Sequence, residues 1–488
     1  MRIVNKSFYK PRKSYVPKAH QNQLGGLNRK IYHKNVFYEI ISLENLFLAW
    51  QEFRKGKTNK IDVQEFEFNL EDNLFELHQE LKSGTYQHSH YATFNVCDPK
   101  LRRIHKACVR DRVLHHAVFR ILYPIFDKRF IFDSYSCRIE KGSHKAINRL
   151  EKFCRKLSKN NSQNIFVLKC DVRNFFNSID QEILLNLIKS KIGDEDAVWL
   201  IDKIIKSFLN GLPLGNVTSQ LFANIYLNEL DQFIKHKLKI KYYLRYCDDF
   251  IILDKDRNSL EELTRQINIF LLAKLKLSLH HDKIIVRKYH QGIDFLGYVV
   301  LPRYRVLRTK TKMRMLRKIE NKQNDLNNNL ISPESFNQSL QSYFGVLKHC
   351  RGYKIRKEIN NKIIMKILGV DHGLKWIGVA ISDDERKMAF PYVTLENNFK
   401  LFSRLNEIIK KEYVCKIVIG LPLNKKMKAT NQTTEVENWA EKLIKEVDLP
   451  IDFENEIFTS KAADRYDAKN RHSAAAAILL QSYLDRKI

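Results

Sequence analysis

The 488-residue sequence has no apolar run that approaches the roughly 18–20 residues needed to span a bilayer. It also has no stretch like the apolar core of a signal peptide, because residues 1–38 are basic and broken by polar side chains. These two absences predict a cytoplasmic protein that does not work at a membrane.

The sequence also has no CxxC pair, although it contains eight cysteines. Scattered cysteines of this kind argue against a disulfide framework and against a thiolate zinc site. There is no internal repeat and no low-complexity tract. The chain is 44% hydrophobic and 11% aromatic, which is typical of a globular protein, and its length allows two or three domains. The cysteines are Cys97, Cys108, Cys137, Cys154, Cys170, Cys247, Cys350 and Cys415.

Acidic residues are missing from two parts of the chain. None precedes Glu39, and residues 303–319 hold eight Lys and Arg without one Asp or Glu. Residues 1–365 carry 65 basic against 37 acidic residues, a net charge of +28, whereas residues 366–488 carry 20 against 18, a net charge of +2. This asymmetry indicates a nucleic-acid-binding surface on the first three quarters of the chain, with a merely solvated basic face as the alternative.

Two adjacent aspartates, Asp248 and Asp249, stand between apolar, β-prone runs in "YLRYCDDFIIL" at residues 243–253. Alone, the pair is compatible with an ordinary turn between two strands. A further aspartate, Asp171, is the next-to-last residue of the strand-like run "NIFVLKCDV" at 164–172. Acids at a strand end and at a nearby hairpin tip are the ligands that two Mg²⁺ ions need for nucleotidyl transfer, and a cation would also offset the repulsion between the paired charges.

Hydrophobic patterning predicts the elements around these acids. After a helical stretch at 333–364, the run "MKILGVDHGLKWIGVAIS" predicts two short strands and the start of a separate α/β domain. The predicted helices of the preceding part cover about 60–84, about 108–128, a stretch from about 180, and about 217–238, and a hairpin is expected over about 242–254.

An ordered set of motifs over roughly residues 35–350 resembles the reverse transcriptases. The resemblance implies an α+β right-hand polymerase, with fingers, palm and a basic N-terminal arm in residues 1–302 and a helical thumb in 303–364. The motifs are "DPKLRRIHKACVRDRVLHHAV" (98–118), "DSYSCRIEKGSHKAI" (133–147), "DVRNFF" (171–176), "GLPLGNVTSQLFANIYLNELD" (211–231), "YCDD" (246–249) and "IDFLGY" (293–298).

The resemblance implies an RNA-directed DNA polymerase that uses two Mg²⁺ ions, a template RNA, a DNA or RNA primer and dNTPs. Lys283, in "HHDKI", stands where the family has a lysine that protonates pyrophosphate, although it could be an ordinary surface lysine. The implied metal ligands, which together with Lys283 form the implied catalytic set, are Asp171, Asp248 and Asp249.

The same resemblance assigns nucleotide contacts. Phe176 stands where the family places its sugar gate, although a core aromatic is the alternative because Phe175 adjoins it. Basic residues of the fingers would grip the triphosphate, or instead contact backbone phosphates. The implied dNTP-binding residues are Lys100, Arg102 and, as a weaker candidate, Arg138 for the triphosphate, Phe176 for the sugar, and Gly215 and Gln220 for the nucleobase.

The stretch "LGNVTSQ" departs from the QGxxxSP pattern of group II introns and retroviruses. It resembles the [ILV]GxxxSQ signature of reverse transcriptases from diversity-generating retroelements. That resemblance implies error-prone copying at template adenines and a small basic accessory protein. A retron-like or other group-II-like bacterial reverse transcriptase is the alternative. A non-catalytic RNA-binding or defence protein is a second alternative, against which the three intact aspartates argue.

Residues 366–488 resemble a second family, the YqgF/RuvX group of RNase H-like proteins. The resemblance implies an α/β RNase H-like domain that acts as a nuclease on Holliday junctions or in pre-rRNA processing. Met365 stands where a free-standing member would begin, which suggests a gene fusion or read-through. The segments that carry the resemblance are "ILGVDHGLKWIGVAISD", "KIVIGLPLNKKMKATNQTTEVENWAEKL", "FENEIFTS" and "HSAAAAILLQSYLD".

The acidic cluster of this second family is incomplete. Asp371 and Glu456 occupy two of the family's acidic positions, but His472 stands where a third acid is usual. An imidazole brings no negative charge and suits softer ions than Mg²⁺, so Mn²⁺ is an alternative metal. The domain is therefore either an active nuclease or a degenerate module that docks nucleic acid or protein. Its near-neutral charge predicts little general affinity for nucleic acid.

Overall fold

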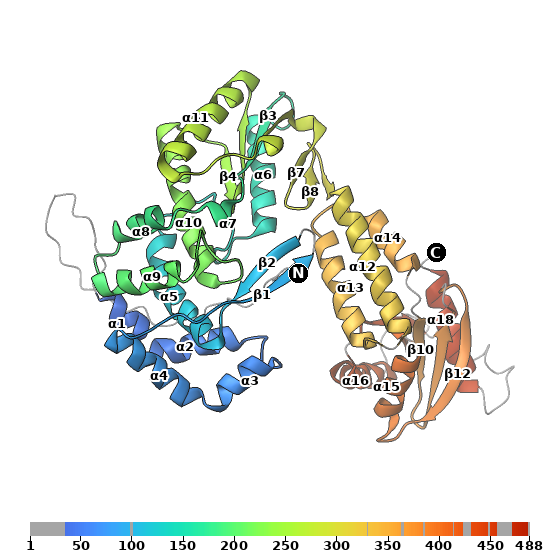
Figure 1. Ribbon diagram of the computed structural model, residues 1–488. Coiled ribbons are helices and arrows are strands. Elements are labelled where there is room, and N and C mark those ends of the chain that lie inside the picture. The colour runs from blue at the N-terminus through green and yellow to red at the C-terminus, as the bar shows by residue number, and fades with distance from the viewer. Residues whose placement is uncertain are drawn as a thin grey trace. The chain divides into compact units, whose positions relative to one another are not determined.

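The computed structural model describes residues 35–97, 101–328, 330–362, 366–383, 386–412, 414–422, 431–447, 449–455 and 471–486 (Figure 1). The chain divides into two compact units. The first is Met1–Leu296 with Val300–Arg303, and the second is Gly297–Val299 with Tyr304–Ile488. No helix within the described ranges combines the length and the apolar character needed to cross a membrane.

The first unit begins with a helical layer. Its helices are α1 (Val36–Ile41), α2 (Leu43–Arg54), α3 (Ile61–Phe68), α4 (Leu70–Ser83), α5 (Val109–Asp127) and α6 (Ser143–Leu157). The single helix expected over about 60–84 is interrupted at Asn69, so the structure has α3 and α4 there. Helix α5 confirms the prediction over about 108–128. Between α4 and α5 the antiparallel hairpin of β1 (Ala92–Cys97) and β2 (Leu101–Lys106) is largely exposed.

A four-stranded antiparallel sheet forms the centre of the first unit. Its order is β4 (Tyr243–Tyr246), β5 (Asp249–Asp254), β3 (Phe166–Asp171) and β6 (Ile285–Lys288). Helix α11 (Arg257–Leu275) packs on β3, β5 and β6, and α6 packs on β4 and β5 (Figure 1). Consecutive residues 250–253 of β5 are all buried, as expected for a strand covered on both faces. The hairpin predicted over about 242–254 is thus confirmed.

Further helices of the first unit lie between and after the strands of this sheet in the chain. They are α7 (Phe175–Ser178), α8 (Gln181–Lys189), α9 (Glu195–Lys206), α10 (Val217–Gln232) with its π-helical continuation η1 (Phe233–Lys237), and the 3₁₀ turns η2 (His281–Lys283) and η3 (Tyr289–Gln291). Helix α8 begins where predicted because the Asp180 carboxylate accepts from Ile183 N. Helix α10 with η1 confirms the long helix expected over about 217–238.

A small three-stranded sheet follows the central sheet in the chain. Its strands are β7 (Ile293–Phe295), β8 (Tyr298–Val300) and β9 (Arg305–Leu307). Three helices of the second unit come next, α12 (Thr309–Asn327), α13 (Pro333–Leu347) and α14 (Tyr353–Lys362). The helical stretch expected over 333–364 is divided between α13 and α14. The chain turns there at Gly352, where a Cβ would lie 2.9 Å from the Leu347 side chain.

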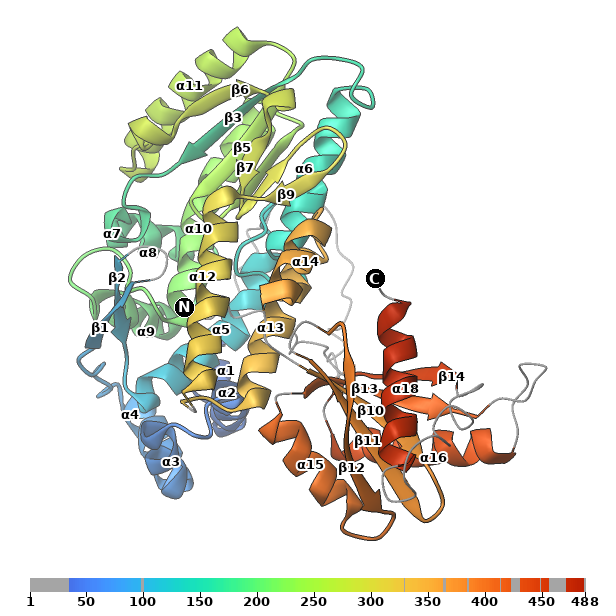
Figure 2. The same ribbon diagram turned by 90° about the vertical axis from the view of Figure 1, so that its right-hand side faces the viewer.

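The rest of the second unit is a mixed five-stranded sheet with helices on both faces, which confirms the predicted α/β domain (Figure 2). Helices α15 (Leu401–Lys411) and α16 (Asn431–Glu446) contribute to a core with Leu368 and Val370, whereas α18 (Arg471–Asp485) contributes to a core with Ile367. This alternation along one strand places the two cores on opposite faces. The strand order is β12 (Ala389–Glu396), β11 (Trp376–Ser382), β10 (Lys366–His372), β13 (Val414–Leu421) and β14 (Ile451–Asn455).

Candidate active site

Strand register brings the three aspartates of the first unit together. Asp171, the last residue of β3, lies opposite Asp249, the first residue of β5. On the other side, Asp249 pairs with Tyr246 of β4, which leaves Cys247 and Asp248 as a two-residue turn. Directly opposite residues of an antiparallel pair point to the same face. The three carboxylates therefore lie at one end of the central sheet.

The turn itself is tight. Cys247 has φ of +56°, in the left-handed region that two-residue hairpin turns require and that a residue with a side chain rarely adopts. Asp248 follows at once, and its carbonyl accepts a hydrogen bond from Val172 N at 3.3 Å. The segment that carries Asp248 is thus fastened to the end of β3.

Burial, together with neighbouring charges, shifts the pKa values of two of these acids. Burial and the nearby Asp171 carboxylate raise the pKa of Asp248 above its usual range. Burial raises the pKa of Asp249 to about 6, against the opposing effect of Lys169, whose Nζ lies 4.0 Å from Asp249 Oδ1. A raised carboxyl pKa means that the chain does not fully compensate the negative charge at this turn. A bound cation would compensate it.

Lys283 lies within the same cluster. Its Nζ donates to Asp171 Oδ1 at 2.6 Å, and the backbone nitrogen of the nearby His280 donates to the Asp171 carbonyl at 2.9 Å. The structure thus brings Lys283 to the carboxylates. An ordinary surface lysine would not be expected to make this contact. Its role in protonating pyrophosphate stays a prediction.

The chemistry of these carboxylates suits magnesium, but their present arrangement is not that of a formed metal site. Carboxylate oxygens are the ligands that Mg²⁺ prefers. However, the described part of the chain contains no group of three His, Cys, Asp or Glu side chains already arranged around a metal position. Instead the Lys283 ammonium occupies one oxygen of Asp171. Asp171, Asp248 and Asp249 could hold the cation if it replaced that ammonium at Asp171.

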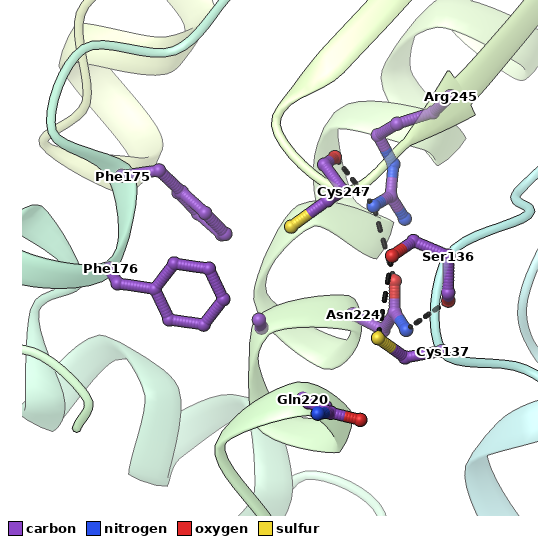
Figure 3. Close-up of a pocket in the computed structure, with 9 residues that line it drawn as sticks. Ser136, Cys137, Phe175, Phe176, Gln220, Asn224, Arg245 and Cys247 are labelled. Atoms are coloured by element: carbon purple, nitrogen blue, oxygen red, sulfur yellow. Dashed lines mark hydrogen bonds between the residues drawn. The ribbon is translucent and has the colours of Figure 1, made fainter. Parts of the chain in front are cut away.

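A small pocket beside the turn contains two of the predicted nucleotide contacts. Figure 3 shows the Phe176 ring pointing into it, between Gln220 of α10 and Cys247 of the turn. Its free volume of about 10 Å³ holds about one water molecule, so a nucleobase does not fit as the pocket stands. Phe175 is the core residue of the pair, being 3% exposed, whereas Phe176 is half-buried.

Gly215 connects this region to the exposed hairpin. Its φ is +124°, and a Cβ there would lie 3.2 Å from the His105 carbonyl oxygen on β2. The adjacent Leu214 carbonyl accepts from His105 N at 3.0 Å. The close backbone approach at Gly215 is therefore made to strand β2, which also carries the exposed Arg102 opposite Val96. Lys100 lies outside the described residues.

Arg138 has a different set of partners from the predicted triphosphate. Its guanidinium is buried and donates to Asp127 Oδ1 at 2.7 Å, to the Ile131 carbonyl at 2.7 Å and to the Ser134 carbonyl at 3.1 Å. These bonds hold the loop after α5. The geometry therefore does not favour Arg138 as a phosphate ligand.

Sequence reasoning missed a buried arginine directly behind the aspartate turn. Arg245, on β4, is 1% exposed and donates to the Cys247 carbonyl and to Asp231 of α10. The available signal was a charged residue inside the apolar run "YLRY", since buried charges are retained only with partners. A second missed network joins two buried imidazoles, with His88 Nε2 and His115 Nε2 3.1 Å apart.

In the second unit, register places Asp371 close to the start of α18. Asp371 of β10 lies opposite Gly378 of β11. A Cβ on Gly378 would lie 1.9 Å from the His472 carbonyl oxygen, so the first turn of α18 rests directly on the sheet there. Asp371 shares the sheet face of Ile367, which packs toward α18. The structure thus brings Asp371 and His472 to one place, while Glu456 lies outside the described residues.

Family models match both parts of the chain. A model described as reverse transcriptase (RNA-dependent DNA polymerase) matches residues 97–300, and a model described as Holliday junction resolvase (RuvX) matches residues 365–486. A "Putative pre-16S rRNA nuclease" of Maridesulfovibrio salexigens is 42% identical over 134 residues, which are 25% of this chain and 99% of that protein.

Two further likenesses concern the larger part. The group II intron-encoded protein LtrA of Lactococcus lactis subsp. cremoris is 25% identical over 349 residues, which cover 56% of this chain and 56% of that protein. Apo telomerase from Candida tropicalis covers 43% of this chain and 53% of its own, at 14% identity and a TM-score of 0.33, too slight a likeness to argue from. The chain joins a domain that matches the reverse transcriptases over residues 97–300 to a domain, residues 365–486, through which it belongs to the RuvX family.

Proposed function

We propose that the protein makes cDNA from a template RNA by nucleotidyl transfer at Asp171, Asp248 and Asp249, with two Mg²⁺ ions. The observation that carries this proposal is the register of the central sheet, which sets Asp171 opposite Asp249 and beside the Asp248 turn. The raised pKa values of Asp248 and Asp249 support it, because a site with uncompensated negative charge favours a divalent cation.

Each residue of the site has a distinct task in this reaction. When bound, magnesium supplies Lewis acidity to the primer 3′-hydroxyl and to the departing pyrophosphate. The three carboxylates would hold the ions. Lys283, whose Nζ lies 2.6 Å from Asp171 Oδ1, would donate a proton to pyrophosphate. Phe176, with its ring in the pocket beside the turn, would meet a ribose 2′-hydroxyl and so favour deoxynucleotides.

The template and primer would be held by the basic parts of the chain. In this proposal residues 1–302 form fingers and palm with a basic N-terminal arm, and residues 303–364 form the thumb. Helix α12 carries most of the eight basic residues of 303–319. Lysines and arginines that neutralise phosphates supply affinity without sequence preference. The three-part division and the role of residues 1–34, which lie outside the described ranges, stay predictions.

The subclass rests on one short motif. The "LGNVTSQ" stretch, with Gly215 and Gln220, supports a reverse transcriptase of a diversity-generating retroelement, with a small basic accessory protein as partner. The 25% identity with LtrA, a group II intron-encoded protein, keeps a group-II-like or retron-like enzyme as the competing assignment. Flanking DNA that contains a near-repeat differing only at template adenines would decide for the retroelement.

For residues 366–488 we propose a nuclease that acts on Holliday junctions or on pre-rRNA, with a degenerate docking module as the rival. The 42% identity with a relative named as a pre-16S rRNA nuclease supports the nuclease, as does the position of Asp371 beside the start of α18. Against it stands His472, which brings no negative charge to a site that holds Mg²⁺ or Mn²⁺.

Primer extension tests the polymerase proposal. Full-length protein, a poly(rA) template with an oligo(dT) primer, dTTP and Mg²⁺ should give extended primers. Asp248→Asn should give none. Asp254→Asn is the matched control, because Asp254 is an acid at the far end of the same strand, opposite Phe166. Equal activity in the two variants would contradict the assignment.

A further inference from the structure

Arg245 is a fully buried charged side chain beside the proposed polymerase site, paired with the equally buried Asp231. It lies on β4, two residues before Cys247, and is 1% exposed. Burial of a guanidinium costs several kcal/mol unless every N–H finds an acceptor. A guanidinium buried directly behind the proposed metal-binding turn therefore indicates that its hydrogen bonds have a structural role there.

All five N–H donors of Arg245 are used. Nε donates to one oxygen of Asp231 at 2.8 Å, and Nη2 donates to the other at 2.6 Å. Nη2 also donates to Ser134 Oγ at 3.2 Å. Nη1 donates to Asn224 Oδ1 at 3.2 Å and to the Cys247 carbonyl at 3.1 Å. The guanidinium therefore joins α10, the loop after α5 and the aspartate turn in one rigid fork.

The bond to Cys247 acts on Asp248. A peptide unit is planar, so a fixed Cys247 carbonyl also fixes the backbone nitrogen of Asp248. Cys247 has φ of +56°, a conformation that persists only where its surroundings hold it. The Arg245 Nη1 donor is one such restraint.

The same arginine fastens the pocket to the turn. Arg245 N donates to the Asp133 carbonyl, and its own carbonyl accepts from Tyr135 N, each at 2.9 Å. Asn224, which accepts from the guanidinium, donates to the Ser136 carbonyl at 2.9 Å. Figure 3 shows this chain of contacts from Arg245 through Asn224 to Ser136, beside the pocket into which Phe176 points.

We propose that Arg245 is a positioning residue of the polymerase. Through the Cys247 carbonyl it sets the Asp248 carboxylate against Asp171, and through Asn224 and the 133–136 loop it keeps the adjoining pocket in register with that carboxylate. The inference rests on the proposed polymerase function for its kinetic consequence, but its structural consequence can be measured without catalysis.

Arg245→Lys in the full-length chain tests the proposal. The charge is retained, but a single ammonium cannot reach Asp231, Asn224 and the Cys247 carbonyl together. We expect kcat for dTTP incorporation to fall about 100-fold, as for a small misplacement of a reacting group, with KM for primer–template nearly unchanged. We expect the affinity for Mn²⁺ alone, measured by electron paramagnetic resonance without nucleic acid, to fall about tenfold.

Arg110→Lys is the matched control. Arg110 also forms a two-bond ion pair, with the two carboxylate oxygens of Glu80 at 3.0 and 2.9 Å, but it is partly exposed and joins α5 to α4. Its kcat and Mn²⁺ affinity should stay within about twofold of the unmodified protein. If folded Arg245→Lys matches Arg110→Lys in both quantities, the proposal is overturned.

A second variant covers failure of Arg245→Lys to fold. Asn224→Ala leaves the ion pair with Asp231 but removes one acceptor of the guanidinium and the bond to Ser136. It should lower kcat and Mn²⁺ affinity in the same direction, by less, and unchanged values would overturn the proposal. Should the unmodified chain show no DNA synthesis, the proposed function fails, whereas the comparison of Mn²⁺ affinities still decides the role of Arg245.

Discussion

The two sites proposed for this chain differ in how they are built. In the first unit, Asp171 and Asp249 are neighbours on paired strands, and Asp248 belongs to the turn between β4 and β5. In the second unit, Asp371 is on a strand, but His472 is contributed by a helix that packs on the sheet. A site made by one sheet depends on register alone, whereas a site made by a sheet and a helix depends also on their packing.

Two stretches of the chain, divided at residue 365 and not at the boundary of the units, also differ in charge. Residues 1–365 have a net charge of +28 and residues 366–488 a net charge of +2. The first therefore has the means to bind a polyanion by itself. The second, if it acts on nucleic acid, would receive its substrate through specific contacts or through the part of the chain to which it is joined.

The largest expected effect breaks the first site. Asp248→Asn should abolish DNA synthesis, since the amide cannot supply the charge that holds the cations. Binding of template RNA should stay nearly intact because it depends on the basic surface. Parallel measurements of primer extension and of RNA binding by filter retention check this. Loss of both activities together would instead indicate that the variant is misfolded.

The charge comparison predicts the next largest effect. Affinity for a template RNA should fall about 1,000-fold between about 50 and 200 mM salt if six or more phosphates are neutralised. A chain ending at residue 364 should bind as tightly as the full chain. Fluorescence anisotropy titrations measure both quantities, and tight RNA binding by residues 366–488 alone would contradict the charge count.

Sugar discrimination is a more moderate effect. Phe176→Ala should increase ribonucleotide incorporation about tenfold while deoxynucleotide use changes little, because only the 2′-hydroxyl meets the ring. Phe176→Tyr, which retains the ring, is the control and should keep the discrimination. The ratio of kcat/KM for the two sugars measures it. A parallel fall in both sugars would make Phe176 a packing residue.

The raised pKa of Asp249 predicts a stability effect of the metal-free protein. A carboxyl whose pKa is raised to about 6 by folding binds its proton more tightly in the native state, so stability falls as pH rises from about 4 through 6. In EDTA, Asp249→Asn should therefore raise the Tm at pH 8 and leave it unchanged near pH 3.5. Calorimetry at the two values checks the difference, and a lower Tm at pH 8 would contradict it.

The smallest effect concerns His472. If residues 366–488 form a nuclease, cleavage of branched DNA or structured RNA should favour Mn²⁺ over Mg²⁺, because an imidazole ligand suits the softer ion. His472→Asp should then increase Mg²⁺-dependent cleavage, and Asp371→Asn should abolish cleavage. Robust Mg²⁺-dependent cleavage by the unmodified domain would contradict the special role of His472.

Local patterns were sufficient for the elements that carry the first site. Apolar, β-prone runs on either side of Asp248 and Asp249 predicted the hairpin over about 242–254, and the apolar run that leads to Asp171 predicted β3, since both depend on neighbours in sequence. Breaks inside helices were missed at Asn69 and before Gly352, where packing overrides the periodic pattern.

Contacts between segments that are distant in the chain could not be predicted from the sequence. The Arg245 guanidinium bonds Ser134, 111 positions earlier in the chain, and nothing local to either residue indicates the other. Arg138 looked like a phosphate ligand by its motif, but its position within reach of Asp127 and two carbonyls became visible only in the fold.

The central claim is that DNA synthesis depends on the sheet-built site and not on the site of the second unit. The most direct test compares Asp171→Asn with Asp371→Asn in Mg²⁺-dependent extension of oligo(dT) on poly(rA) by the full-length chain. We expect no extension with Asp171→Asn and the rate of the unmodified protein with Asp371→Asn. Extension that survives in Asp171→Asn, or is lost in a folded Asp371→Asn, would contradict this account.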